Sequence, residues 1–190
     1  MKITRIRVHA VSVRPRAVAL YRLDRSIPLG EQLRLAAKHK WIAEIDTDDG
    51  LTGVGESHRG IPEESVREAL TPILGLDPLR LNLRRLPADP SGRAYDVAEI
   101  ALYDLVGKAL GYSACHLLGG PFRDRVRVHY WMGKRTPEES VDIAQEAVAK
   151  GFHGIKIKCG NDAPEHDTVA RIEAIRRAVG DELELELDAN

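Results

Sequence analysis

The chain has 190 residues, of which 43% are hydrophobic, and this is enough for one sizeable core or two modest ones. Its 28 basic and 29 acidic residues are interspersed and give a net charge of −1, which argues against a nucleic-acid footprint and a polybasic membrane patch. No segment approaches the roughly 20 apolar residues of a membrane span. We therefore expect a small-molecule partner, with no nucleic acid and no membrane.

The cysteines and the amino terminus indicate a compartment. Cys115 and Cys159 lie in different segments without Cys-x-x-Cys spacing, which favours neither a disulfide framework nor a zinc site. Residues 1–7 alternate charged and apolar residues, whereas a signal peptide has an unbroken apolar run. We expect a cytoplasmic protein.

The first third of the chain is predicted to form a three-stranded antiparallel meander. Apolar and polar residues alternate over 5–10 and again over 41–46, which is typical of half-buried strands. The Thr-Asp-Asp-Gly sequence at 47–50 predicts a tight hairpin, because Asp-Gly accepts a positive φ, and 52–57 would return as the third strand. The charged stretch 22–38 has weak periodicity and predicts a long loop with a helical turn.

The middle third is predicted to be helical. A helix over 61–74 begins with proline and two acidic residues, as helix N-termini favour. A second helix over 94–110 carries small and apolar residues on one face, at Ala98, Ala101, Leu102, Leu105 and Ala109. The Leu-Gly-Gly-Pro sequence at 118–121 interrupts this pattern, and we place a domain boundary there, after residue 124.

From residue 125 onward the pattern is strand, helix, strand, helix, strand. Strands are predicted from 125 to 131, from 153 to 158 and from 183 to 188. The helix that begins after Thr136 should bury Val141, Ala144 and Val148, and the helix over 164–179 should bury Val169, Ile172, Ile175 and Val179. This order implies a parallel sheet with right-handed crossovers, in either a barrel or a doubly wound fold.

Side-chain alternation places the charged residues of the last two strands on one face. In the middle strand two isoleucines should face the helices, so that Lys156 and Lys158 face the other way. In the last strand three leucines should face the helices, while Glu184, Glu186 and Asp188 do not. A doubly wound sheet is covered by helices on both faces and tends to be apolar throughout, so a barrel interior fits better.

Five stretches in fixed order carry a family resemblance. They are Asp-Gly-Leu-Thr-Gly-Val-Gly-Glu at 49–56, the helical run at 99–111, Leu-Leu-Gly-Gly at 117–120, Lys-Ile-Lys at 156–158 and Asp-Ala-Asn at 188–190. Together they resemble the N-terminal portion of enolase-superfamily enzymes of the mandelate racemase and muconate lactonizing enzyme kind. The resemblance implies an α+β capping domain over 1–124, followed over 125–190 by the first three strands of a modified TIM barrel.

The resemblance also implies a mechanism. Such enzymes remove the proton next to a carboxylate, and a bound Mg²⁺ or Mn²⁺ stabilises the enediolate that forms. By resemblance Asp188 would be the first metal ligand, Lys158 the base, and Lys156 a contact of the substrate carboxylate. The substrate would be a small carboxylate such as a sugar acid, undergoing racemisation, dehydration or cycloisomerisation, and the full-length form would be a homo-oligomer.

Five further residues are candidates for the site or its surroundings. Asn190 would add a hydrogen bond near the metal, and Glu56 and His58 would belong to a capping loop over the site. His129 and Trp131 share the inward face of the first barrel strand, where they either contact substrate or fill a layer of the interior. Each of these roles is a hypothesis that follows from position along a predicted element.

The resemblance further implies an incomplete enzyme. Strands four to eight of the barrel would lie beyond Asn190, together with two further acidic ligands and any opposing acid or base. We therefore expect the 190-residue chain to be truncated, inactive alone and poorly folded in its last third. Two other interpretations stay open: a non-catalytic remnant that keeps the capping domain as an interaction module, and a barrel enzyme that uses Lys158 for Schiff-base chemistry.

Overall fold

The computed structural model describes residues 1–14, 28–35, 38–88, 92–160 and 166–189. The chain divides into two compact units, of which the first comprises 1–13 with 38–124 and the second 14–37 with 125–190. The assignment of 1–124 to one capping domain stays a prediction. In the described part of the chain, none of the helices has both the length and the apolar character that crossing a membrane requires.

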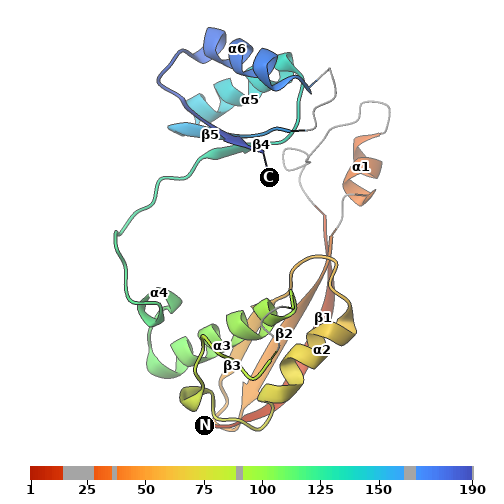
Figure 1. Cartoon of the computed structure of the whole chain (residues 1–190), viewed down its shortest axis with the longest axis vertical. Helices are drawn as coiled ribbons and strands as arrows, with labels where there is room; N and C mark the ends of the chain where they lie inside the picture. The colour runs from red at the N-terminus through yellow and green to blue at the C-terminus, as the bar shows by residue number, and fades with distance from the viewer. Residues whose placement is uncertain (15–27, 36–37, 89–91, 161–165, 190) are drawn as a thin grey trace. The chain divides into compact units, whose positions relative to one another are not determined.

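The first unit contains a three-stranded antiparallel sheet (Figure 1). Its strands are β1 (Ile3–Val13), β2 (Lys38–Thr47) and β3 (Thr52–Glu56), with β2 in the centre. The turn between β2 and β3 has Gly50 at a φ of 87°, the positive value that the Asp-Gly sequence predicts. The expected meander is present, and its first two strands are longer than the alternation indicated.

The first unit also contains α-helices and 3₁₀ turns. They are α2 (Glu63–Leu70), the 3₁₀ turns η2 (Thr71–Ile73) and η3 (Pro78–Arg80), α3 (Tyr95–Leu110) and α4 (Ala114–Leu117). The helix predicted over 61–74 is shorter than expected, because Pro72 has no N–H to continue the α-helical ladder and the chain tightens into η2. The helix predicted over 94–110 is present as α3.

Close packing of α3 against β3 builds the core of the first unit. Gly53 and Gly55 face this helix, and a Cβ at either position would overlap a backbone carbonyl oxygen, that of Ala101 or of Val97. The absence of side chains on the strand therefore lets the helix backbone approach it directly. The buried residues around this contact are Ile3, Ala43, Ile45, Val66, Leu70, Ile73, Leu86, Val97, Ala98, Ala101, Leu102 and Leu105.

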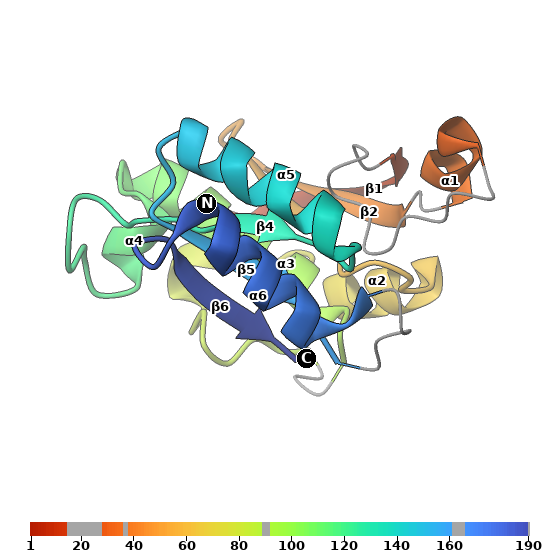
Figure 2. The ribbon, with the colours of Figure 1, turned by 90° about the horizontal axis from the view of Figure 1, so that it is seen from above.

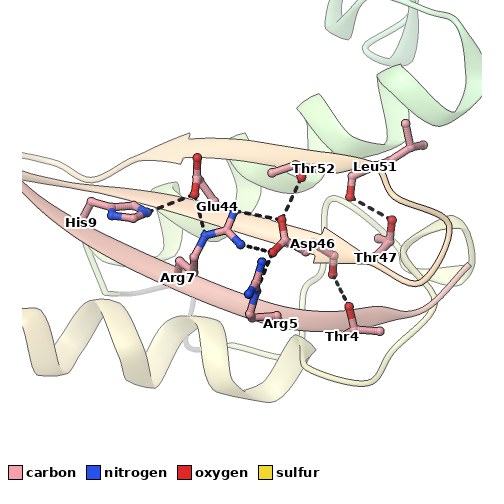
Figure 3. Close-up of polar contacts among 9 residues, drawn as sticks. All are labelled: Thr4, Arg5, Arg7, His9, Glu44, Asp46, Thr47, Leu51 and Thr52. Atoms are coloured by element: carbon pink, nitrogen blue, oxygen red, sulfur yellow. Dashed lines mark hydrogen bonds and ion pairs between the residues drawn. The ribbon is translucent and has the colours of Figure 1, made fainter.

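The opposite face of the sheet carries a network of ion pairs (Figure 3). Arg7 donates to Glu44 at 2.8 Å and to Asp46 at 3.1 Å, and Arg5 donates to Asp46 at 2.8 Å. The hydrogen bond from Arg7 holds the pKa of Glu44 below its usual value. Burial raises the pKa of Asp46, but hydrogen bonds from Arg5, Thr52 and Arg7 outweigh it and the net pKa is lowered.

The second unit contains a parallel sheet in the order β4-β5-β6. Its elements are α1 (Leu29–Leu35), β4 (Tyr130–Met132), α5 (Pro137–Ala149), β5 (Gly154–Lys158), α6 (Thr168–Val179) and β6 (Glu184–Asp188). Helices α5 and α6 lie side by side over one face of the sheet (Figures 1 and 2). The loop predicted over 22–38 lies partly outside the described residues, and its described part forms α1 rather than a single turn.

The first strand of the second unit is shorter than predicted. Residues 125–129 are not in a strand, and Val126, which the predicted alternation places on the face opposite His129 and Trp131, is 71% exposed. Pairing explains the difference, since β5 begins at Gly154 and its register supplies partners only for Tyr130 to Met132. Alternating residues without a partner strand have no ladder to join. The last predicted helix also begins later than expected, at Thr168, and residues 161–165 lie outside the described part.

The buried faces of α5 and α6 differ from the predicted stripes. Ala144 and Ile175 are buried as predicted, but Val148 and Val169 are exposed, and the helices bury three residues outside the predicted stripes: Ser140, Ala147 and Arg171. Small side chains allow α5 and α6 to pack closely against each other, and Ala144 and Ala147 lie in one buried cluster with Ile175. Leu187 of β6 is likewise half exposed rather than covered.

Candidate active site

Strand register brings Lys156, Lys158 and Asp188 together. Lys158 is the direct partner of Asp188 across β5 and β6, and its Nζ lies 3.1 Å from Oδ1 of that carboxylate. Lys156 Nζ lies 3.2 Å from Oδ2 of the same carboxylate. The three polar groups therefore share one face of the sheet, as the alternation predicted, and the carboxylate lies between two ammonium groups.

The apolar residues of β5 fix this orientation. Ile155 and Ile157 are fully buried in the cluster beneath α5 and α6, so the lysines between and after them must point to the other face. The side chain of Lys158 is only 12% exposed and that of Asp188 is 22% exposed. The Cys159 N–H donates to the Asp188 carbonyl at 3.0 Å, which connects the carboxyl ends of the two strands, and the Cys159 side chain is buried.

A buried arginine anchors the end of β5 from the helix side. Both terminal nitrogens of Arg171 donate to the Lys158 carbonyl at 3.1 Å, and one also donates to the Gly133 carbonyl at 3.4 Å. The side chain is fully buried, so these carbonyls take the place of water around its charge. No local sequence pattern indicates this role, since Arg171 is one of several arginines on an amphipathic helix.

Two more cations lie buried near the end of β4. Lys134 donates to the Gly160 carbonyl, which connects the loop after β4 to the loop after β5. Burial lowers the pKa of the Arg135 guanidinium below its usual value, and the charge of Glu139 opposes that effect in part. These residues, like Arg171, support the backbone at the carboxyl end of the sheet.

The other candidates of the second unit lie further from Asp188. Trp131 is the register partner of Lys156 and is half-buried beside it. His129 lies towards the amino-terminal end of the sheet, where its Nδ1 is 3.0 Å from Oε2 of Glu186. Glu186 itself is 4.0 Å from the Lys156 Nζ. A substrate contact by His129 or Trp131 stays a prediction.

The remaining candidate residues are Glu56, His58 and Asn190. Glu56 and His58 lie in the first unit, where Glu56 pairs with Lys40 and the His58 Nδ1 is 2.9 Å from the Arg59 carbonyl oxygen. Their expected part in a capping loop stays a prediction. Asn190 lies outside the described residues.

The chemistry of Asp188 suits a hard divalent cation. Mg²⁺ and Mn²⁺ prefer oxygen ligands, and the Asp188 carboxylate, 22% exposed, is partly shielded from water. A different group of ligand side chains has no recognisable sequence pattern: His129, His153 and Glu184 place one ligand atom each within 4.8 Å of one another. They are far apart along the chain, and only the strand register could have revealed them.

Known proteins resemble this chain in sequence and in structure. Residues 139–190 match the family described as Enolase C-terminal domain-like. The chain is 34% identical to the hydrophobic dipeptide epimerase of Enterococcus faecalis, over 78% of this chain and 45% of that protein. It is 32% identical to the D-galactonate dehydratase of Verminephrobacter eiseniae, over 78% of this chain and 44% of that protein.

A solved structure agrees with these sequence matches. The dipeptide epimerase from Enterococcus faecalis V583, complexed with Mg and the dipeptide L-Leu-L-Tyr, superposes with a TM-score of 0.76 at 29% identity. The superposition covers 100% of this chain and 54% of that one. The chain thus spans about half the length of the curated relatives it matches.

Proposed function

Because the chain belongs to the enolase superfamily, among enzymes of the mandelate racemase and muconate lactonizing enzyme kind, we propose that it supplies part of the site of a Mg²⁺-dependent enolising enzyme. Its relatives include epimerases, racemases and dehydratases. The observation that carries the proposal is the direct pairing of Lys158 with Asp188 at the carboxyl ends of β5 and β6.

The proposal assigns a separate role to each charged group. Lys158, the less exposed of the two lysines, removes the proton from the carbon next to the substrate carboxylate. Lys156 binds and orients that carboxylate with its ammonium group. Asp188 holds the cation. When bound, a divalent cation supplies the positive charge that stabilises the negative charge developing on the substrate oxygens.

The proposal extends to the architecture. Residues 1–124 would form an α+β capping domain, and 125–190 would begin a modified TIM barrel whose interior is the face that carries the lysines. Two observations support this order: the parallel β4-β5-β6 sheet covered by helices on one face, and the concentration of charged side chains on the other. Barrel enzymes gather their catalytic groups at the carboxyl ends of the strands, which is where Lys158 and Asp188 lie.

We also propose the partners and the limits of activity. The substrate is a small carboxylate such as a sugar acid, the assembled enzyme is a cytoplasmic homo-oligomer, and the isolated 190-residue chain does not turn over. The last point rests on the oxygen ligands that β6 supplies on this face: Asp188 Oδ1 lies 3.1 Å from the Lys158 Nζ, whereas Glu186 Oε1 lies 4.0 Å from the Lys156 Nζ, further from the end of the strand. A Mg²⁺ site needs more protein or substrate oxygens than this.

One experiment tests the proposal against its alternatives. The protein that carries this chain is incubated in D₂O with sugar acids and dipeptides, and exchange of the α-proton is followed by NMR with Mg²⁺ and with EDTA. We expect exchange that EDTA abolishes. Trapping of a substrate on Lys158 by borohydride would instead support Schiff-base chemistry, and the absence of exchange with every substrate would support a non-catalytic interaction module.

A further inference from the structure

A second cluster of ligand side chains lies at the amino-terminal end of the parallel sheet, away from Asp188. The Nε2 of His129 is 3.5 Å from Oε2 of Glu184, and the Nε2 of His153 is 3.9 Å from the same oxygen. The two imidazole rings meet edge to face, with centroids 5.0 Å apart. Three ligand atoms therefore converge on one point from three successive segments.

The backbone of the sheet is arranged to hold this cluster. Gly154 is the register partner of Glu184, and the Glu184 N–H donates to the His153 carbonyl at 2.9 Å. A Cβ on Gly154 would lie 2.7 Å from both Cδ2 and Nε2 of His129. The absence of a side chain on Gly154 leaves room for the His129 ring to lie across β5 beside Glu184.

A fourth residue sets the orientation of His129. Glu186 is a carboxylate and accepts a hydrogen bond, so the Nδ1 of His129 at 3.0 Å is the donor. The Nε2 of the same ring then faces Glu184, at 3.5 Å from Oε2, where it is available as a ligand atom. Carboxylate–histidine pairs of this kind are the usual support of a metal-binding histidine.

We propose that His129, His153 and Glu184 bind a Zn²⁺ ion, with Glu186 as the positioning residue. Two imidazoles and one carboxylate form a ligand set that suits zinc, whereas Mg²⁺ prefers oxygen ligands alone. Ligands about 2.0 Å from a tetrahedral ion lie about 3.3 Å apart. The His–Glu separations are 3.5 and 3.9 Å and all three ligand atoms lie within 4.8 Å of one another, so binding draws the side chains together by about 1.5 Å at most. The ion would fasten together the starts of β4, β5 and β6.

Zinc titration of the full chain by calorimetry, in the presence of excess Mg²⁺, tests the proposal. We expect one Zn²⁺ per chain. His129→Ala, His153→Ala and Glu184→Gln should each weaken binding by about 100-fold or more, and Glu186→Gln by about 10-fold. Gly154→Ala keeps every ligand but displaces the His129 ring, and it should weaken binding comparably to loss of a ligand. Far-UV circular dichroism without metal checks that each variant folds.

Two controls separate this site from others. His116→Ala alters an exposed histidine of the first unit and should leave zinc binding unchanged, as should Asp188→Asn, which alters the proposed magnesium ligand. Failure of the enolising proposal would therefore leave this result intact. The proposal is overturned if the wild-type chain does not bind Zn²⁺, if Gly154→Ala binds as the wild type does, or if nitrogen-15 NMR shows His129 doubly protonated both with and without zinc.

Discussion

The side-chain nitrogen of Lys158 lies 3.1 Å from a carboxylate oxygen of Asp188, and the two residues are direct partners across β5 and β6. Strand pairing rather than chance proximity produces this contact. Because side chains alternate along a strand, a slip of one residue in either strand would turn one of the two charges into the apolar cluster beneath the helices. The buried isoleucines on both sides of Lys156 make such a slip costly.

Asp188→Asn should remove metal-dependent chemistry while leaving the fold in place. The amide keeps the size of the side chain but lacks the negative charge that holds a divalent cation, so in the protein that carries this chain we expect Mg²⁺-dependent α-proton exchange to fall by about 100-fold or more. The matched control is Asp181→Asn in the exposed loop before β6, which should exchange as the wild type does. Equal exchange rates in the two variants would contradict the role of Asp188.

Arg171→Met should destabilise the second unit. The substitution fills most of the space but removes the donors that satisfy the Lys158 and Gly133 carbonyls, and we expect a loss of about 2–4 kcal/mol in the free energy of unfolding. Urea unfolding followed by circular dichroism measures this loss. Arg177→Met on the same helix removes an arginine that is 72% exposed and should change stability by less than about 0.5 kcal/mol. Similar losses of stability in the two variants would show that the buried hydrogen bonds of Arg171 contribute little to the free energy of unfolding.

Gly55→Ala should destabilise the first unit. The added methyl group would overlap the Val97 carbonyl oxygen, and because backbone cannot rotate away, α3 must shift from the strand. Overpacking of this kind costs about 1–3 kcal/mol. Gly30→Ala is the matched control, since nothing lies within 4 Å of its Cβ position. Thermal unfolding of both variants decides the matter, and a melting temperature for Gly55→Ala at or above that of the control would refute the packing argument.

The first unit should lose stability in acid through the network around Asp46. The pKa values of Glu44 and Asp46 are lowered in the folded protein, so both carboxylates stabilise the fold above their usual values of about 4. That contribution disappears as the pH falls through the lowered values. The difference in melting temperature between the wild type and Asp46→Asn should therefore be largest near neutral pH and shrink below about pH 4. Parallel melting curves across this range would contradict the assignment.

Period-two alternation predicted the polar face well, because it depends on backbone geometry that every strand shares. Ile155 and Ile157 are buried and Lys156 and Lys158 are not, as expected. The same pattern failed at Val126, since alternation gives no information on whether a partner strand is present. Strand ends depend on register, and register is set by contacts distant in sequence.

The buried faces of the helices and the clusters of polar side chains were predicted less well, for similar reasons. Ala147 is buried and Val148 is exposed, because close packing within the cluster that α5 shares with α6 favours the smaller side chain over the more apolar one. A fully buried arginine is equally hard to foresee, since its partners are backbone carbonyls without any sequence signature. The group of His129, His153 and Glu184 has no local spacing and follows only from the order of the strands.

The central claim is that Lys158 removes the substrate's α-proton. The most direct measurement is the rate of α-proton exchange in D₂O for Lys158→Gln, in the protein that carries this chain and with Mg²⁺ present, beside Lys108→Gln on α3 as a control. Loss of a general base should slow exchange by about 10² to 10⁴-fold in Lys158→Gln, with the control unchanged. Exchange in Lys158→Gln within about threefold of the wild type would contradict the claim.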